Sequence, residues 1–300
     1  MTDDLFRGEP EPDEPAAVLY QHTVLAQTCL PYRNPGLEVR RWERSQGAVR
    51  LEIEAGRAFH PDRGRFVDLG LPFGPKPRLI LAHLNAEALR TGSPEIEVEA
   101  SLTAFVRRIQ GRSPTGPEIR LFKDQLARLA TAQVRLAVAY NEQAARQVQA
   151  HLIGEFDLWL PKGPGGRVLW PATVTLDPRY FISLTKHAVP LHERALAALA
   201  ALAHNAMALD LYAWLAQRLH RVDPARPAFV PWTALKEQFG WHYGSIRKFR
   251  QVFRPTLELA LAQYPGARID LDGQGLTLHH SPPPVLCRRS PVITGSKPSE

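Results

Sequence analysis

Residues 241–256 carry the side chains whose types and spacing point most clearly to a chemical role. The stretch holds four cations and one glutamine, and no acidic residue interrupts it. Arginine can fork to guanine, lysine can pair with a phosphate, and glutamine can read adenine. With one residue about every 100°, these polar side chains stand away from an apolar helix face, except Arg250, which lies at the margin of that face. That face would contain Ile246, Phe249, Phe253 and Leu257. The pattern predicts a helix that lies in the major groove of duplex DNA.

The candidate DNA-contacting residues comprise this helix, the turn before it and two cations of an earlier segment. An ordinary solvated face is the alternative interpretation of the helix, but such a face normally mixes both signs of charge. We expect at least one of Arg247, Arg250 and Arg254 to reach a base edge, and the others and Lys248 to contact phosphates. The full candidate set is His242, Tyr243, Ser245, Arg247, Lys248, Arg250, Gln251, Arg254, Arg120 and Lys123.

The elements around this helix have the order of a winged helix-turn-helix. Within the helix, Pro255 removes a backbone donor and should kink or end the first segment. Alternation of apolar and polar residues after the helix indicates a β-hairpin. The expected elements are a short strand at 228–231, a helix at 232–239, a break at Gly240, the basic helix from about Ser245, and strands at 267–272 and 276–279 joined through 273–275.

An earlier segment repeats this plan loosely, with a helix over 102–109, a turn over 111–116 and a second helix that begins at Pro117. On the second helix Arg120 and Lys123 share their side with Asp124. We therefore expect backbone contacts, a packing role or a dimer surface from this helix, and sequence preference from the basic helix near the C-terminus.

The remaining periodicities complete an α+β fold of two tandem winged helix-turn-helix domains, which we place at 37–184 and 185–284. The N-terminal domain would carry extended β-hairpins. Its glycine-rich turn at 163–166 lacks the Lys-Ser/Thr pair of a phosphate loop. The other expected elements are a hairpin over 37–54, a helix over 79–90, strands at 133–138, around 148, at 156–160, 167–170 and 173–176, a helix over 180–186 and one long helix over 191–221.

Charge is distributed unevenly along the 300 residues. The net charge of +7 favours a polyanionic partner, and because the first sixteen residues carry −5, the rest of the chain holds +12. We expect residues 1–36 to form an acidic, mostly disordered leader and residues 285–300 a flexible tail.

The two cysteines, Cys29 and Cys287, lie in these weakly structured ends and indicate a reducing cytosol. No basic-then-apolar signal segment opens the chain. The most apolar run, 195–219, contains His204 and Asp210 near its middle, so we expect a buried helix and no membrane span.

Seven short segments stand in order between residues 37 and 284. They are GPKPRLIL at 74–81, EALRT at 87–91, SLTAFVRR at 101–108, FDLW at 156–159, HAVPL at 187–191, AMALDLYAWLA at 206–216 and KEQFG at 236–240. Together they resemble the RepA-type replication initiators of bacterial plasmids. The resemblance implies an origin-binding protein with two tandem winged-helix domains, which acts in the bacterial cytoplasm. Such proteins bind directly repeated sites in origin duplex DNA, help to open it and recruit host replication proteins, a helicase or an initiator. Many also repress their own gene as homodimers.

Enzymatic interpretations find less support in the sequence. A rolling-circle nicking enzyme would need two histidines that flank one apolar residue, whereas His279 and His280 are adjacent and would point to opposite faces of a strand. His187 and His204 are typical of core or helix-end histidines. We expect no enzymatic activity, no catalytic or metal-binding residue and no cofactor. An autoregulatory transcriptional repressor is the nearest alternative function, and a nicking enzyme the more distant one.

Overall fold

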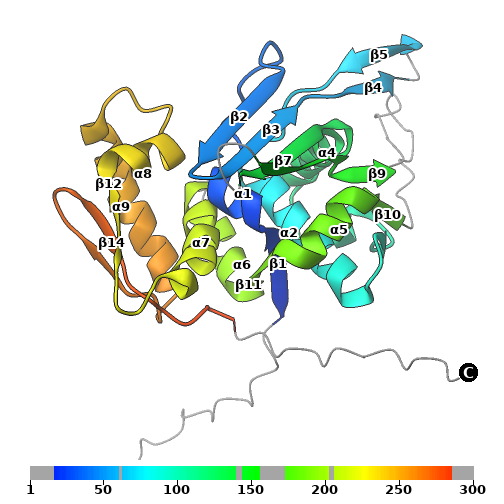
Figure 1. Cartoon of the computed structure of the whole chain (residues 1–300). Coiled ribbons are helices and arrows are strands. Elements are labelled where there is room, and N and C mark those ends of the chain that lie inside the picture. The colour runs from blue at the N-terminus through cyan, green and yellow to red at the C-terminus, as the bar shows by residue number, and fades with distance from the viewer. Residues whose placement is uncertain (1–16, 61–62, 140–143, 156–172, 203–205, 286–300) are drawn as a thin grey trace, which may run out of the picture.

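A four-stranded antiparallel sheet and a set of helices behind it form the body of the protein. The computed structural model describes residues 17–60, 63–139, 144–155, 173–202 and 206–285. The sheet has the order β2-β3-β7-β8, and helices from both halves of the chain contact it (Figure 1). Its strands are β2 (Arg41–Gln46), β3 (Val49–Glu54), β7 (Gln133–Ala139) and β8 (Ala145–His151).

The hairpin of β2 and β3 confirms the alternation expected over 37–54, because Val49, Leu51 and Ile53 are buried while Arg50 is exposed. A second hairpin follows immediately, formed by β4 (Arg57–His60) and β5 (Arg65–Asp68), and it extends beyond the sheet at the upper right of Figure 1. No strand was expected between the first hairpin, which ends at 54, and the helix expected from 79.

The first helix-turn-helix order is present. Gly111 adopts φ 66° after the first helix, and Thr115 and Glu118 form a capping box at the start of the second. Strands β7 and β8 then supply a hairpin, so the order is helix, turn, helix, hairpin. The helices of this half are α2 (Pro75–Thr91), α3 (Leu102–Gln110), α4 (Gly116–Thr131) and α5 (Pro178–His187), with a small sheet of β6 (Glu95–Glu97), β9 (Ile153–Glu155) and β10 (Thr173–Leu176).

The second helix-turn-helix order is present as well, and the expected boundaries lie within a few residues of those observed. The side chain of Ser245 accepts a hydrogen bond from the backbone N–H of Lys248 and so caps the long basic helix. The elements are β12 (Ala228–Pro231), α8 (Trp232–Phe239), α9 (Ile246–Ala262), β13 (Ile269–Leu271) and β14 (Gly275–Leu278).

Of the two effects expected of Pro255, a kink or an end of the helix, the end is not observed. The helix continues from Ile246 to Ala262 with the proline inside it. The missing backbone donor leaves the carbonyl of Gln251 without its helical partner, but Gln251 and Pro255 are both exposed, so water can replace the missing bond. Buried side chains on the opposite face, including Phe253 and Leu257, hold the helix together across this position.

The expectation of a mostly disordered leader was wrong for its C-terminal part. Strand β1 (Val18–His22) and helix α1 (Thr23–Thr28) are formed and largely buried, and Cys29 is fully buried. Strand β1 pairs along its full length with β11 (Ala188–His192). This pairing could not be read from a local pattern, because its two strands are about 170 positions apart.

The expected single helix over 191–221 was also wrong. Residues 188–192 form β11, with Pro190 opposite Tyr20, and a helical pattern resumes only after His192. The helical part is divided into α6 (Glu193–Ala201), α7 (Ala206–Arg218) and a short 3-10 turn, η2 (Leu219–Arg221). A uniformly apolar run concealed the breaks, since it offers no periodicity to interrupt.

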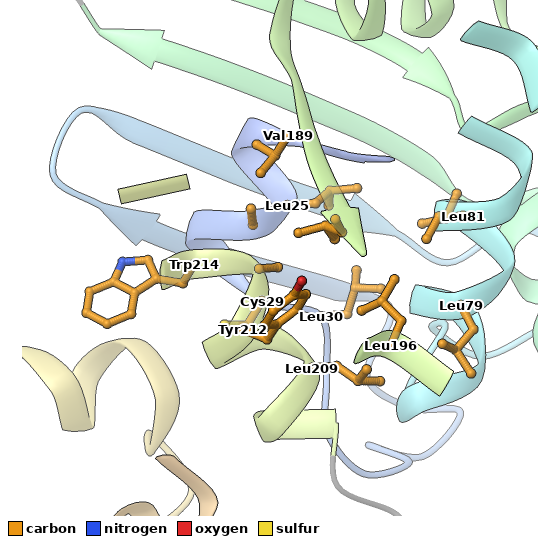
Figure 2. Close-up of a cluster of buried hydrophobic side chains, with 14 of the residues drawn as sticks. Leu25, Cys29, Leu30, Leu79, Leu81, Val189, Leu196, Leu209, Tyr212 and Trp214 are labelled. Atoms are coloured by element: carbon orange, nitrogen blue, oxygen red, sulfur yellow. The ribbon is translucent and has the colours of Figure 1, made fainter. Parts of the chain in front are cut away.

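One continuous core joins both halves of the chain. Figure 2 shows Leu25 of α1, Leu79 of α2, Val189 of β11 and Leu209 of α7 within a single apolar cluster. Among the described residues the buried cluster extends from Leu19 to Leu278.

A buried ion pair crosses the same core. The guanidinium of Arg78 on α2 donates two hydrogen bonds to the carboxylate of Asp210 on α7, at 2.6 and 2.7 Å, and further bonds to the carbonyls of Leu30 and Gly74. The pair is well satisfied, as a buried ion pair must be.

Some predictions lie outside the described residues. These are the strands at 156–160 and 167–170, the turn at 163–166, His204, Cys287, residues 1–16 of the leader and residues 286–300 of the tail. The division into domains at 184 and 185 stays a prediction.

Candidate nucleic-acid interface

Helix α9 is positioned by an aromatic cluster on its inner face. Phe249 and Phe253 are fully buried, and their rings lie 6.2 and 5.5 Å from that of Trp232 at the start of α8. Gly240 ends α8 against the ring of Phe249, where a Cβ would come within 2.2 Å of ring carbon Cδ2. The turn therefore needs glycine for the two helices to pack this closely.

The outer face of α9 presents the residues that the helical spacing predicted. Arg247, Lys248 and Gln251 are exposed, and Nζ of Lys248 lies 3.3 Å from Oε1 of Gln251. Within the described part of the chain, Arg247 makes no hydrogen bond or ion pair. This side chain is consequently available for a base edge or a phosphate. Ser245 is exposed at the N-terminus of the helix, where its hydroxyl oxygen serves as the cap.

Arg250 and Arg254 are arranged differently from Arg247. Nη2 of Arg250 donates to the carbonyl of Gly273 at 2.9 Å, and Nη2 of Arg254 donates to the carbonyl of Asp272 at 3.1 Å. Both guanidinium groups lie over the ring of Trp232, at 4.8 and 5.3 Å from its centroid. These two arginines thus connect α9 to the tip of the β13–β14 hairpin. Helical spacing placed Arg254 on the polar side and Arg250 at the margin of the apolar face, but gave no sign of these bonds.

The tip of that hairpin is itself ordered by Asp272. Its Oδ1 accepts hydrogen bonds from the backbone N–H groups of Gln274 and Gly275, which lowers the pKa of the carboxyl. Its carbonyl also accepts a bond from Nε1 of Trp232. The hairpin tip, Trp232 and the two arginines form one connected group, which fixes the position of the hairpin beside α9.

The turn before α9 holds two further candidates. His242 is exposed and Tyr243 is half-buried, and their rings lie 4.1 Å apart. Burial, and then the positive charges of Arg33 and Lys236, lower the pKa of His242. These two cations lie near the same turn, and neither was among the residues predicted from the sequence. Arg33 lies in the stretch expected to be a disordered leader, where no helical spacing marks it.

An aromatic contact ties this turn to the β2 strand. The ring of Trp241 lies 4.8 Å from that of Tyr32 and 4.9 Å from that of Trp42. The guanidinium of Arg44 stacks 4.5 Å above Trp241 and donates to the carbonyls of Glu237 and Gln238. The turn between α8 and α9 therefore rests on the N-terminal half of the chain.

Helix α4 brings its cations into a different setting. Arg120 is exposed, whereas Lys123 is half-buried, and burial lowers the pKa of its amine. Nε of Arg128 lies 2.9 Å from the carboxylate of Asp124, and Glu118 is bonded to Arg112. The structure thus places Arg120 and Lys123 on one helix, far along the chain from α9 and interleaved with paired acids.

Other groups with chemical potential have identifiable structural partners. His22 accepts the N–H of Val24 at Nδ1, so its Nε2 carries the proton and donates to Ser183 at 3.0 Å. An imidazole in that tautomer cannot take a proton from the serine.

The two C-terminal histidines also point apart. His279 bonds to Asp270 at 2.7 Å, while His280 bonds to the carbonyl of Val222. Among the residues described, no group of three His, Cys, Asp or Glu side chains is placed to hold a metal ion. A search of the described helices finds none that is long and apolar enough to cross a membrane.

Comparisons with known proteins identify relatives of this fold and sequence. A crystal structure of domains 2 and 3 of RctB is similar over 87% of this chain and 99% of that chain, with 12% sequence identity and a TM-score of 0.55. A second crystal structure of RctB domains 2 and 3 is similar over 82% and 83% of the two chains, with 11% identity and a TM-score of 0.50. At such identities the likeness concerns the fold alone. No curated protein matches the sequence.

The sequence profile described as "Plasmid encoded RepA protein" matches residues 71–233. The matched segment begins just before α2 and ends at the first turn of α8, so α9 lies beyond it. It includes the GPKPRL motif, whose Arg78 forms the buried pair with Asp210. Because the match covers more than half of the chain, this protein belongs to the family of plasmid-encoded RepA replication proteins.

Proposed function

We infer that the protein initiates plasmid replication by binding repeated sites in the origin duplex in a sequence-specific way, and that it then promotes opening of the origin and recruits host replication proteins. The observation that carries this inference is the outer face of α9, where Arg247, Lys248 and Gln251 are exposed beside a hairpin fixed to the same helix. No acid lies between residues 241 and 256 to oppose a phosphate. Membership of the plasmid RepA family supports the replication role.

The architecture we propose is two tandem winged helix-turn-helix units that share one core. In the C-terminal unit α9 is the reading helix and the β13–β14 hairpin is the wing. In the N-terminal unit α4 occupies the corresponding place, and β7 and β8 the place of the wing. The helix, turn, helix, hairpin order of both units supports this proposal.

Individual roles follow from the surroundings of each side chain. Arg247 and Gln251 would contact base edges and Lys248 a phosphate, because these groups are exposed on α9. Lys236 of α8 and Arg33 would also contact phosphates, because their charges act on His242 in the turn before α9. Arg250 and Arg254 would act mainly by holding the wing, since their guanidinium groups already bond to it.

The N-terminal unit would add phosphate contacts through Arg120 and Lys123, or a surface for a homodimer. The site of action would be the bacterial cytoplasm, where plasmid DNA is replicated. The excess of +12 outside the first sixteen residues implies that affinity falls steeply with salt, by about −0.9 in the slope of log affinity against log salt for each phosphate neutralised. A specific complex whose affinity hardly changes with salt would contradict groove binding.

A transformation assay tests the function directly. A plasmid that carries only the origin is introduced into cells that supply the protein in trans, and footprinting of DNA flanking the gene locates the bound repeats. Maintenance of the plasmid, abolished when Arg247 is replaced by alanine, supports the initiator. Repression of the gene without maintenance would instead identify an autorepressor. Metal-dependent relaxation of the supercoiled plasmid would identify a nicking enzyme.

A further inference from the structure

The β4–β5 hairpin exposes its large apolar side chains and buries a small one. Phe59 and Phe66 stand directly opposite each other on its outer face, and they are 49% and 59% exposed. The apolar side chains of the opposite face are only Ala58, which is buried, and the half-buried Val67, and His60 and Arg65 share this face toward the far end. Burial alone would favour the two large rings inside and the small residues outside. An exposed aromatic pair of this kind is typical of an interaction surface.

The hairpin is firmly attached at its base. Arg40 donates hydrogen bonds to the carbonyls of Leu69, Ala55 and Gly56, at 2.6 to 3.0 Å. Gly56 lies so close to Thr131 of α4 that a Cβ would come within 1.9 Å of its carbonyl oxygen. The ribbon therefore leaves the sheet in a fixed direction and presents its rings on a rigid support.

The two rings form a unit with the arginines around them. Their centroids are 5.6 Å apart with an angle of 68° between the planes, and the guanidinium of Arg57 lies 5.9 Å from the centroid of Phe66. Arg63 is exposed at the far end of the ribbon, and Arg65 is exposed there on the face opposite the rings. The acidic Asp68 is paired with Arg57 and Arg40 at the base. The exposed end of the hairpin thus combines aromatic faces with positive charge.

We propose that the β4–β5 hairpin binds single-stranded DNA, with Phe59 and Phe66 stacking on bases and Arg63 and Arg65 contacting phosphates. Aromatic rings alternating with cations are the means by which proteins bind single strands without strong sequence preference. A phenyl ring reaches the flat face of a base only when that base is unstacked from its neighbour. An apolar protein partner would gain nothing from the arginines, whereas a DNA strand uses both features.

This proposal rests on the proposed function, because opening of an origin is what would supply a separated strand. Figure 1 shows β4 and β5 on the side of the sheet away from α8, α9 and β14. The hairpin is thus a site separate from the reading helix, suited to a segment of DNA next to the bound repeats.

Fluorescence anisotropy of the full-length protein with labelled oligothymidylate tests the assignment. The double-stranded control is the same oligothymidylate annealed to oligodeoxyadenylate of equal length. We expect the Phe59→Ala, Phe66→Ala double variant to bind oligothymidylate at least about tenfold more weakly and the duplex unchanged. The Phe59→Trp, Phe66→Trp variant should retain binding of the single strand. Ile182→Ala, which removes an equally exposed apolar side chain from α5, should change neither affinity.

A charge variant gives a second reading that does not depend on the rings. Arg63→Ala with Arg65→Ala should reduce the salt slope for oligothymidylate by about 0.7 for each phosphate that the variant no longer neutralises. The proposal is overturned if the wild-type protein does not bind oligothymidylate, if the ring variant binds it unchanged, or if single strand and duplex are weakened alike. A change from dimer to monomer in light scattering, with strand binding intact, would also overturn it and make the hairpin a self-interface.

Failure of the proposed initiator function and failure of the hairpin assignment give different results. Absence of footprinted repeats on plasmid DNA would count against the proposed function and leaves the oligothymidylate comparison standing. Absence of the oligothymidylate effect, with footprinted repeats present, would count against the hairpin alone.

Discussion

On α9 the exposed cations face solvent with no acidic residue among them, whereas on α4 the cations alternate with Glu118 and Asp124, which are bonded to arginines. The hairpins differ too. The β13–β14 wing belongs to a small sheet of its own and is attached to its helix by Arg250 and Arg254. The β7–β8 hairpin is built into the four-stranded sheet. The same order of elements thus presents unopposed exposed cations in one region and a hairpin built into a larger sheet in the other.

The regions around α4 and α9 share one core, so we expect them to unfold together, and the ion pair of Asp210 with Arg78 allows a test. Asp210→Ala leaves the buried guanidinium of Arg78 without its counter-ion, at a cost of about 3–5 kcal/mol in the free energy of unfolding. Urea denaturation followed by tryptophan fluorescence and circular dichroism should show one transition at lower urea. Arg78→Met combined with Asp210→Leu should recover much of the stability.

Two separate transitions would contradict a shared core, because each region would then unfold as an independent module. For the same reason a fragment of residues 185–284 is a poor test of DNA binding. It would lack β1, α1 and Arg78, and would leave Asp210 and β11 without partners.

The free energy of unfolding should depend on pH through His22, which connects β1 to Ser183 of α5. Burial, and then the charge of His187, lower the pKa of His22 to about 3. The unfolded chain takes up a proton near pH 6.5 while the folded chain does not, so stability is present above that pH and declines as pH falls. Between about pH 6 and 3 this residue contributes a decrease of about 1.4 kcal/mol per pH unit. His22→Asn, which retains an acceptor to cap α1, should reduce the slope by that amount. An unchanged slope in that variant would assign the effect to other groups, such as His83, whose pKa is lowered to about 4.

The arginines that hold the wing should behave differently from Arg247. Arg254→Ala removes the bond to Asp272 and loosens the wing, which should weaken binding to all duplex sequences by about 1 kcal/mol without changing base preference. Equilibrium binding to several duplexes measures the effect. Glu258→Ala, one turn further along α9 and exposed, is the control. A change of preference at one base pair would show that Arg254 leaves the wing and reads DNA.

The smallest effect is expected on α4. Arg120→Ala and Lys123→Ala should each reduce the salt slope of duplex binding by about one unit if they contact phosphates, and should weaken all sequences alike. Titrations at several salt concentrations check this. Unchanged slopes, together with a shift of the oligomeric state in light scattering, would favour the dimer surface instead.

Local patterns predicted the C-terminal helices and hairpin because each boundary has a local cause. Ser245 caps α9, and Gly240 ends α8. The pairing of β1 with β11 has no such signal, since each strand is defined only by the other. The bonds of Arg250 and Arg254 were likewise hidden. Helical spacing gives the side on which a residue lies, but not which backbone carbonyl comes within its reach.

Selection of duplexes from a randomised library, with the wild-type protein, Arg247→Ala and Arg120→Ala, tests the central claim most directly. If α9 reads the DNA, Arg247→Ala should lose preference at one position of the selected motif, with a penalty of about 1–3 kcal/mol there. Arg120→Ala should select the same motif as the wild type. An altered motif with Arg120→Ala and an unaltered one with Arg247→Ala would contradict the account and assign sequence reading to α4.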